Sequence, residues 1–291
     1  EDGIRDLVRS RGLGDVYKRQ IICRGRAARR GFQNHDKKTR EWRYPPNMKG
    51  LKAIFKRELG SYFDTPVAYV FIVIFLVLNG IFTFYVGGFF ERGQADLAPF
   101  FEFHPWLYMF LIPAVSMRLW SEERKSGTLE LILTLPVSLT ASVVGKFLAA
   151  WVFTALALLG TIPIWVTVNY LGDPDNTVIA ISYIGSLLMA GGFLSIGSCV
   201  SALTKNQVIA FVVSFIICLA FNLSGFPMVL DVFNAWAPQF VVEVIGSFSF
   251  LTHFDSIQKG VIDIRDLIFF ASLIGFWLFA NVLAIEFNKG D

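Results

Sequence analysis

Apolar runs and short charged stretches alternate along most of this chain. Each apolar run has about 20 residues with few charges, which is long enough to cross the hydrocarbon core of a bilayer as a helix. The pattern predicts six membrane-spanning helices, at about 67–90, 99–119, 147–170, 178–203, 208–230 and 267–285. The expected fold class is therefore an all-α membrane protein.

The composition supports a bilayer as the solvent for most of the chain. Of the 291 residues, 54% are hydrophobic and only 17% are charged, whereas a soluble domain carries about 25% charged residues. The chain has three Cys residues, two of them inside apolar runs, so no disulfide framework is expected.

The distribution of basic residues predicts the orientation, because Lys and Arg collect on the cytoplasmic side of membrane proteins. If the six spans alternate in direction, one side receives ten basic residues: Lys49, Lys52, Lys56, Arg57, Arg118, Arg124, Lys125, Lys146, Lys205 and Lys289. The other side receives three, which are Arg92, Lys259 and Arg265. Both termini are therefore expected in the cytoplasm.

Residues 1–47 differ in charge from the rest of the chain. They contain 13 Lys and Arg against 6 Asp and Glu, whereas residues 48–291 contain 13 against 17. The segment lacks the apolar core of a signal peptide. We expect it to be an extension foreign to the protein, with Met48 as the natural start, or else a disordered basic arm attracted to anionic lipid.

Residues 50–63 are expected to form an amphipathic helix before the first span. Apolar residues recur at helical spacing: Leu51, Ile54, Phe55, Leu59 and Tyr62. The charged residues are expected on the opposite side: Lys52, Lys56, Arg57 and Glu58. Such a helix would lie in the headgroup layer with its basic residues towards anionic lipid. The alternative is an ordinary helix of the kind found in soluble proteins.

The region 118–140 joins the second and third spans. Arg118 to Lys125 are expected to extend the second span as a polar helix that ends at Ser126-Gly127. Thr128 can then cap a short apolar helix, 129–135, which Pro136 closes, and another helix starts at Ser138. This predicts an apolar helix held outside the bilayer that needs a partner. The alternative is a loop that packs on its own bundle.

Residues 231–266 mix aromatic, charged and Pro residues and do not form a clean span. Short helices at the outer interface, or a re-entrant segment that dips into the bilayer, are expected here. The alternative is a seventh, broken span, which would place the C-terminus outside.

The fourth expected span is rich in small residues. Gly191, Ser195 and Cys199 recur every four residues and mark a helix-packing face. This face belongs either to the inside of the bundle or to a dimer contact.

Few strongly polar residues lie within the expected spans, and such residues are functional candidates. Glu102 and His104 are expected near the outer interface, either solvated or paired with each other. Asn79 and Asn222 can bridge helices or line a pathway. So few charges favour an amphipathic or lipid-like cargo, or a mainly mechanical role.

Signatures of enzymes are missing from the sequence. Gly145-Lys146 lacks the upstream Gly and the following Ser or Thr of a phosphate-binding loop. The three His residues are scattered, so a zinc site is not expected. We therefore expect a chain that is not an enzyme, and that binds neither a metal nor a cofactor itself.

Two stretches carry a family resemblance: "LKAIFKRELGSYFDTP" at 51–66 and "SMRLWSEERKSGTLELILTLPVSLTASVVGKFLA" at 116–149. With the six-span layout of 48–291, they resemble the membrane subunit of ABC-type-2 exporter permeases, of the gliding-motility and nitrous-oxide-cluster type. The resemblance implies an elbow helix that includes Leu51, Lys52, Ile54, Phe55, Lys56, Arg57 and Leu59. It also implies that a coupling region contacts an ATP-binding subunit through Glu122, Glu123, Arg124, Gly127, Thr128, Glu130, Leu131 and Pro136.

The family further implies an assembly of two permeases and two ATP-binding subunits in the bacterial inner membrane. The second permease would be another copy of this chain or a paralogue, ATP and Mg would be bound by the partner subunit, and nucleic acid is not an expected partner. One other class remains open from the residues, a membrane scaffold that recruits a cytoplasmic protein without transport. A secondary transporter would need midplane charges or paired broken helices, and the sequence shows neither.

Overall fold

The computed structural model describes residues 48–130, 137–234 and 237–287, and within these ranges all regular secondary structure is helical. This confirms the all-α fold class. Residues 1–47 and most of the expected coupling helix, 131–136, lie outside the described residues.

The helices follow one another in this order: α2 (Met48–Phe63), α3 (Pro66–Ile81) with a π-helical turn η1 (Phe82–Val86), α4 (Ala98–Glu102), α5 (His104–Ser116), α6 (Arg118–Ser126), α8 (Leu139–Leu159), α9 (Ile162–Leu171), α10 (Asn176–Leu203), α11 (Gln207–Leu223), α12 (Pro227–Asn234), α13 (Gln239–Ser247), α14 (Phe250–Gln258) and α15 (Ile264–Phe287). The start expected at Ser138 is confirmed, because its side chain accepts a hydrogen bond from the Ala141 amide and caps α8.

Four segments of the described chain are long and apolar enough to cross a membrane: Pro66–Val86, Leu139–Leu171, Asn176–Leu203 and Ile264–Phe287. The number rises to six if two bent pairs of helices, α11 with α12 and α13 with α14, each count as one span. Only this upper number equals the six spans predicted from the sequence, and its members differ, because it contains α13 with α14 in place of the expected span at 99–119.

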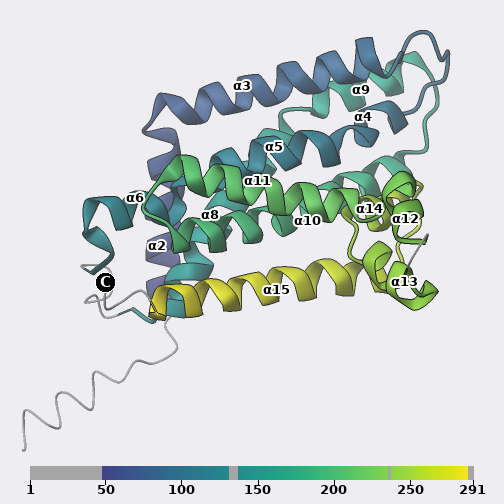
Figure 1. Ribbon diagram of the computed structural model, residues 1–291. Coiled ribbons are helices and arrows are strands. Elements are labelled where there is room, and N and C mark those ends of the chain that lie inside the picture. Colours follow the sequence, from purple (N-terminus) through teal and green to yellow (C-terminus); the bar gives the residue numbers. More distant parts are fainter. Residues whose placement is uncertain (1–47, 131–136, 235–236, 288–291) are drawn as a thin grey trace, which may run out of the picture. The chain divides into compact units, whose positions relative to one another are not determined.

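The expected span at 99–119 is not one uninterrupted helix. It corresponds to α4 and α5, which are separated at Phe103, and α5 ends before Met117. Pro105 lies in the first turn of α5, and Pro113 lies inside it, where Pro weakens a continuous helix. Even so, most residues of α5 are buried, and it runs alongside α3 and α11 in the bundle (Figure 1).

The expected fifth span, 208–230, is not one straight helix. α11 ends at Leu223, and α12 leaves it at an angle of 75°. Gly225 at this break lies so close to Ser249 that a Cβ atom would be 2.3 Å from the Ser249 hydroxyl. A straight helix across residues 224–227 would lose this close approach.

Helix α10 occupies the centre of the bundle and packs against α5, α6, α8, α11, α14 and α15. Its small residues allow this. A Cβ atom at Gly191 would lie 3.1 Å from both Trp151 on α8 and Ile274 on α15, so this predicted packing position faces neighbours in the same chain. Ser195 and Cys199, the other two, are also buried.

The expected short helices at 231–266 are present as the end of α12, α13 and α14. α14 is fixed to the bundle by a stack of Phe250 on Phe193, with ring centroids 4.3 Å apart. It is also fixed by His253, whose Nδ1 lies 2.6 Å from Asp266 at the start of α15. α13 and α14 meet at an angle of 63°, a geometry that suits either a re-entrant segment or a broken span.

Figure 1 shows that α2 and α6 lie at one end of the bundle, together with the C-terminal end of α15. α12, α13 and α14 lie at the opposite end. The polar segments 50–63 and 118–126 are thus neighbours in space, and Arg57 of the first lies 3.9 Å from Glu123 of the second.

Candidate functional site

The amphipathic helix α2 packs its apolar side against α8. Gly145 of α8 makes this possible, because a Cβ atom there would lie 3.0 Å from Ile54 and 3.4 Å from the Leu51 carbonyl oxygen. Further along, Tyr62 stacks on Phe153 with ring centroids 4.8 Å apart. Helix α2 is therefore fixed to the bundle through specific contacts.

One residue of α2 was assigned to the wrong side. Glu58 was expected among the charged residues of the outer face, but its side chain is only 15% exposed and points towards α8. The other three, Lys52, Lys56 and Arg57, are exposed as expected. The reason for the difference is a buried cation opposite Glu58.

This cation is Lys146, on the first half of α8, and its side chain is only 3% exposed. Its Nζ atom lies 2.7 Å from Glu123 Oε1 and 3.3 Å from Glu58 Oε2. It also donates a hydrogen bond of 3.0 Å to the Leu119 carbonyl oxygen. An ammonium group has three donors, so Lys146 has one partner for each of them.

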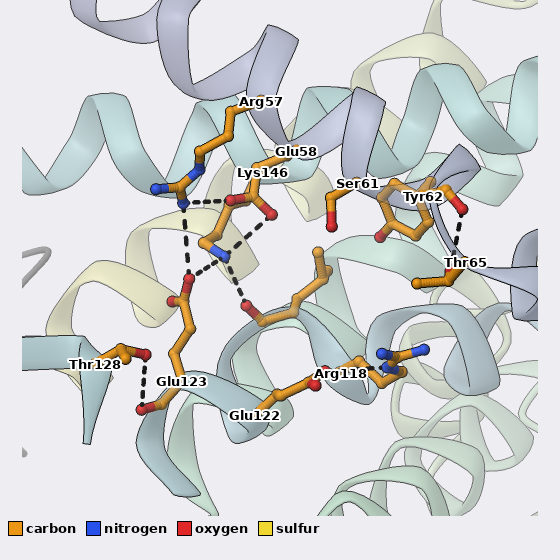
Figure 2. Close-up of a pocket in the computed structure, with 11 residues that line it drawn as sticks. Arg57, Glu58, Ser61, Tyr62, Thr65, Arg118, Glu122, Glu123, Thr128 and Lys146 are labelled. Carbon is orange, nitrogen blue, oxygen red and sulfur yellow. Dashed lines mark hydrogen bonds and ion pairs between the residues drawn. The ribbon is translucent and has the colours of Figure 1, made fainter. Parts of the chain in front are cut away.

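Two further groups complete the surroundings of Lys146. Arg57 Nη2 lies 2.5 Å from Glu58 Oε1 and 3.9 Å from Glu123 Oε1 (Figure 2). The ring of Trp120 is 5.0 Å from the Lys146 nitrogen, within range of a cation–π interaction. We call Arg57, Glu58, Glu123 and Lys146 the Lys146 cluster, in which two cations and two carboxylates join α2, α6 and α8.

Burial governs the electrostatics of the cluster. Burial raises the pKa of the Glu123 carboxyl, while Lys146 acts in the opposite direction. The hydrogen bond to Glu58 raises the pKa of Arg57. One oxygen of Glu123, Oε2, is buried without a hydrogen-bond partner. The buried charges of such a set therefore depend on one another, and the loss of one leaves buried groups with fewer opposite charges beside them.

A pocket of about 580 Å³ lies beside the cluster, between α2 and α6 (Figure 2). Ser61, Tyr62 and Thr65 of α2 and the turn that follows it line one side. Arg118 and Glu122 of α6 line another, with Arg118 Nε 3.1 Å from Glu122 Oε2. The inner face of α6 is thus held by the ion pairs of the Lys146 cluster, and the pocket lies next to it.

The break expected at Gly127 is confirmed. Gly127 has φ +73° and ends α6 in the left-handed conformation that favours Gly. The Thr128 hydroxyl lies 2.9 Å from that of Ser126 and donates to the Glu123 carbonyl oxygen at 3.4 Å. Both of these Thr128 contacts are with residues of α6.

Several predicted coupling residues form an exposed surface on and after α6. The predicted residues are Glu122, Gly127, Thr128 and Glu130, and the neighbouring Lys125 and Ser126 are exposed as well. Glu123 belongs to the cluster instead, and Arg124 reaches across to α10. Leu131 and Pro136 lie outside the described residues.

The four candidate pathway residues differ in their surroundings. Asn79 donates to the Phe75 carbonyl oxygen of its own helix, whereas Asn222 bridges α11 and α5 by donating 3.0 Å to the Pro105 carbonyl oxygen. Glu102 is exposed. His104 is fully buried among aromatic rings, including Phe100 at 4.5 Å, so the expectation that it is solvated or paired with Glu102 near the outer interface is wrong.

Lys146 was not predicted as a site residue: the sequence placed it among the cytoplasmic basic residues and in an incomplete phosphate-binding motif. A signal was present. Lys146 is the one charged residue of the sequence between Glu130 and Asp173, in a helix that is otherwise apolar or small. Such a residue needs a partner or a route to water, and the sequence does not show which carboxylate supplies it.

The chain is similar to a known protein family. No curated protein sequence matches it significantly. The profile of the ABC-2 family transporter protein matches residues 105–284, which is more than half of the chain and includes α5 to most of α15. Together with the long apolar helices, this match identifies a multi-pass membrane permease component of an ABC transporter: the chain belongs to the ABC-2 transporter family.

Proposed function

We propose that this chain is the membrane subunit of an ATP-driven exporter in the bacterial inner membrane, with both termini in the cytoplasm. A separate ATP-binding subunit, which the family implies, contacts the exposed end of α6 and the segment that follows Gly127. ATP and Mg belong to that subunit. A second permease, identical or paralogous, completes the assembly.

The observation that carries this proposal is the anchoring of α6. Its inner face is joined to α2 and α8 by the Lys146 cluster, while its far end presents exposed polar groups. A rigid element transmits a displacement that a flexible loop would absorb. A partner that pushes on the exposed end would therefore move α6 and the helices bound to it as one unit.

Gly127 provides a direct test of whether α6 acts as a lever, that is, as a rigid element that transmits a push from the partner. Pro cannot adopt φ +73°, because its ring fixes φ near about −65°. Gly127→Pro should therefore disrupt the end of α6 and the exit of the following segment. We expect co-purification with the ATP-binding subunit to weaken, and the stimulation of its ATPase rate by this chain in nanodiscs to fall about tenfold.

A matched control at the same position separates geometry from side-chain chemistry. Asn tolerates the left-handed region, and the space around Gly127 is open within 4 Å, so Gly127→Asn should retain most of the stimulation. A charge at Leu131, as in Leu131→Glu, should also reduce it if that residue faces the partner. Wild-type stimulation in both Gly127→Pro and Leu131→Glu would contradict the proposed lever.

The scaffold alternative predicts a docked partner too. It differs in that the partner would hydrolyse no ATP, or would hydrolyse it at the same rate with and without this chain. The comparison of ATPase rates with and without the permease therefore distinguishes the two functions.

A further inference from the structure

Helix α6 has a second attachment, separate from the Lys146 cluster. The first amide groups of any helix lack partners within it, and α6 begins at a break in a buried region, next to Met117. The amides of Trp120 and Ser121 both donate to the hydroxyl of Ser201 on α10, each at 3.1 Å. A residue 80 positions away in sequence thus caps the start of α6.

The Ser201 hydroxyl also donates to the Met117 carbonyl oxygen at 2.8 Å. A hydroxyl has one donor and two acceptor lone pairs, so Ser201 directs its full capacity to the start of α6. Ser182, another buried hydroxyl of α10, donates to the Val178 carbonyl oxygen of its own helix at 2.8 Å and lies 3.3 Å from the Gln258 carbonyl oxygen, with no contact to α6. Ser201 is fully buried, so water does not substitute for these bonds.

The reverse contact comes from Arg124 of α6. Its Nη1 atom donates to the Ala202 carbonyl oxygen at 2.7 Å, in the last turn of α10. Cations at this position satisfy unpaired carbonyl groups and interact favourably with the helix dipole. Helices α6 and α10 therefore cap each other.

We infer that Ser201 and Arg124 form a joint through which movement of α6 is passed directly to the central helix α10. This inference rests on the proposed function and adds two positioning residues to it. If α6 moves, the end of α10 must follow, or three buried hydrogen bonds at Ser201 must break. Helix α10 in turn contacts most of the bundle, and its Ser198 accepts a hydrogen bond of 2.7 Å from Asn281 on α15.

The test compares the positions of α6 and α10 in the complex with the ATP-binding subunit, before and after trapping with ADP and vanadate. Spin labels at Lys125→Cys on α6 and at Leu203→Cys on α10 are each measured against Val73→Cys on α3. All three positions are exposed, and the native Cys residues are replaced. In the otherwise wild-type chain both distances should change on trapping.

In Ser201→Ala the α6 distance should still change, while the shift at α10 falls at least about fivefold. Arg124→Gln, a change at a partly exposed residue that spares the buried hydroxyl, should give the same result more weakly. Ser201→Thr keeps the hydroxyl and should restore the shift. Ser182→Ala removes a buried hydroxyl from α10 without a contact to α6, and should leave both distances as in wild type.

Hydrogen exchange on the permease alone checks the caps without a partner. The amides of Trp120 and Ser121 should exchange faster in Ser201→Ala than in Ser182→Ala. Equal exchange, or an undiminished α10 shift in both Ser201→Ala and Arg124→Gln, would overturn the joint and leave the proposed function intact. A wild-type complex in which neither helix responds to trapping would overturn both.

Discussion

Lys146→Met is expected to destabilise the protein by about 3–5 kcal/mol, the range found when one partner of a buried ion pair is removed. Met has a similar length and fits an apolar helix, so the effect reports the lost charge more than lost volume. Two carboxylates would remain at the junction of α2, α6 and α8 with only Arg57 as a cation. These are Glu58 and Glu123, whose side chains are 15% and 16% exposed. SDS titration of the reconstituted protein, followed by circular dichroism, measures the change.

Two further variants show whether charge is the cause. Lys146→Met combined with Glu123→Gln removes one cation and one carboxylate, so a large part of the loss should be recovered. Lys125→Met removes an exposed Lys from α6, and a surface change of this kind should stay within about 0.5 kcal/mol. A loss below about 1 kcal/mol in Lys146→Met would show that the cluster is not a buried ionic unit.

The second large effect is expected at Gly197, where α10 crosses α5. A Cβ atom at Gly197 would lie 2.8 Å from the Cβ of Ser116 and closer still to its hydroxyl. Rotation of Ser116 can move its hydroxyl but not its Cβ, so the two helices must separate. We expect Gly197→Ala to cost about 1–3 kcal/mol, as overpacking of a well-packed core does, in the same SDS titration.

Ser116→Gly removes both of the obstructing atoms. The double variant Ser116→Gly with Gly197→Ala should therefore lose less stability than the sum of the two single variants. Gly275→Ala on α15 is the matched control, because nothing lies within 4 Å of its added Cβ, and it should cause no loss. Additive losses at Gly197 and Ser116 would refute the steric explanation.

Much of the architecture was predictable because it depends on local pattern. The apolar runs predicted the all-α fold, the amphipathic spacing predicted α2, and the left-handed preference of Gly predicted the end of α6 at Gly127. Span limits were less accurate at 99–119 and 208–230. There, turns and close contacts, such as that of Gly225 with Ser249, interrupt runs that are uniformly apolar in sequence.

The candidate site was predicted only in part. Residues 118–126 were recognised from their charges, but Lys146 and Ser201 were not, because nothing in an apolar helix reveals which distant group a single polar side chain meets. Glu58 illustrates the same limit. Its position in the sequence groups it with the exposed charged residues of α2, but its side chain faces Lys146 of α8 and is mostly buried.

The sequence by itself determined that this protein lies in a membrane as a set of helices. It also determined that the charged segment 118–126 follows the second apolar region. These properties follow from hydropathy and backbone preference, which each segment carries alone. Only the tertiary structure decided that α2, α6 and α8 share a buried ionic cluster and that α6 and α10 cap each other. Buried charges and unpaired helix ends must find partners, and which partners they find depends on the packing of segments that are far apart in the chain.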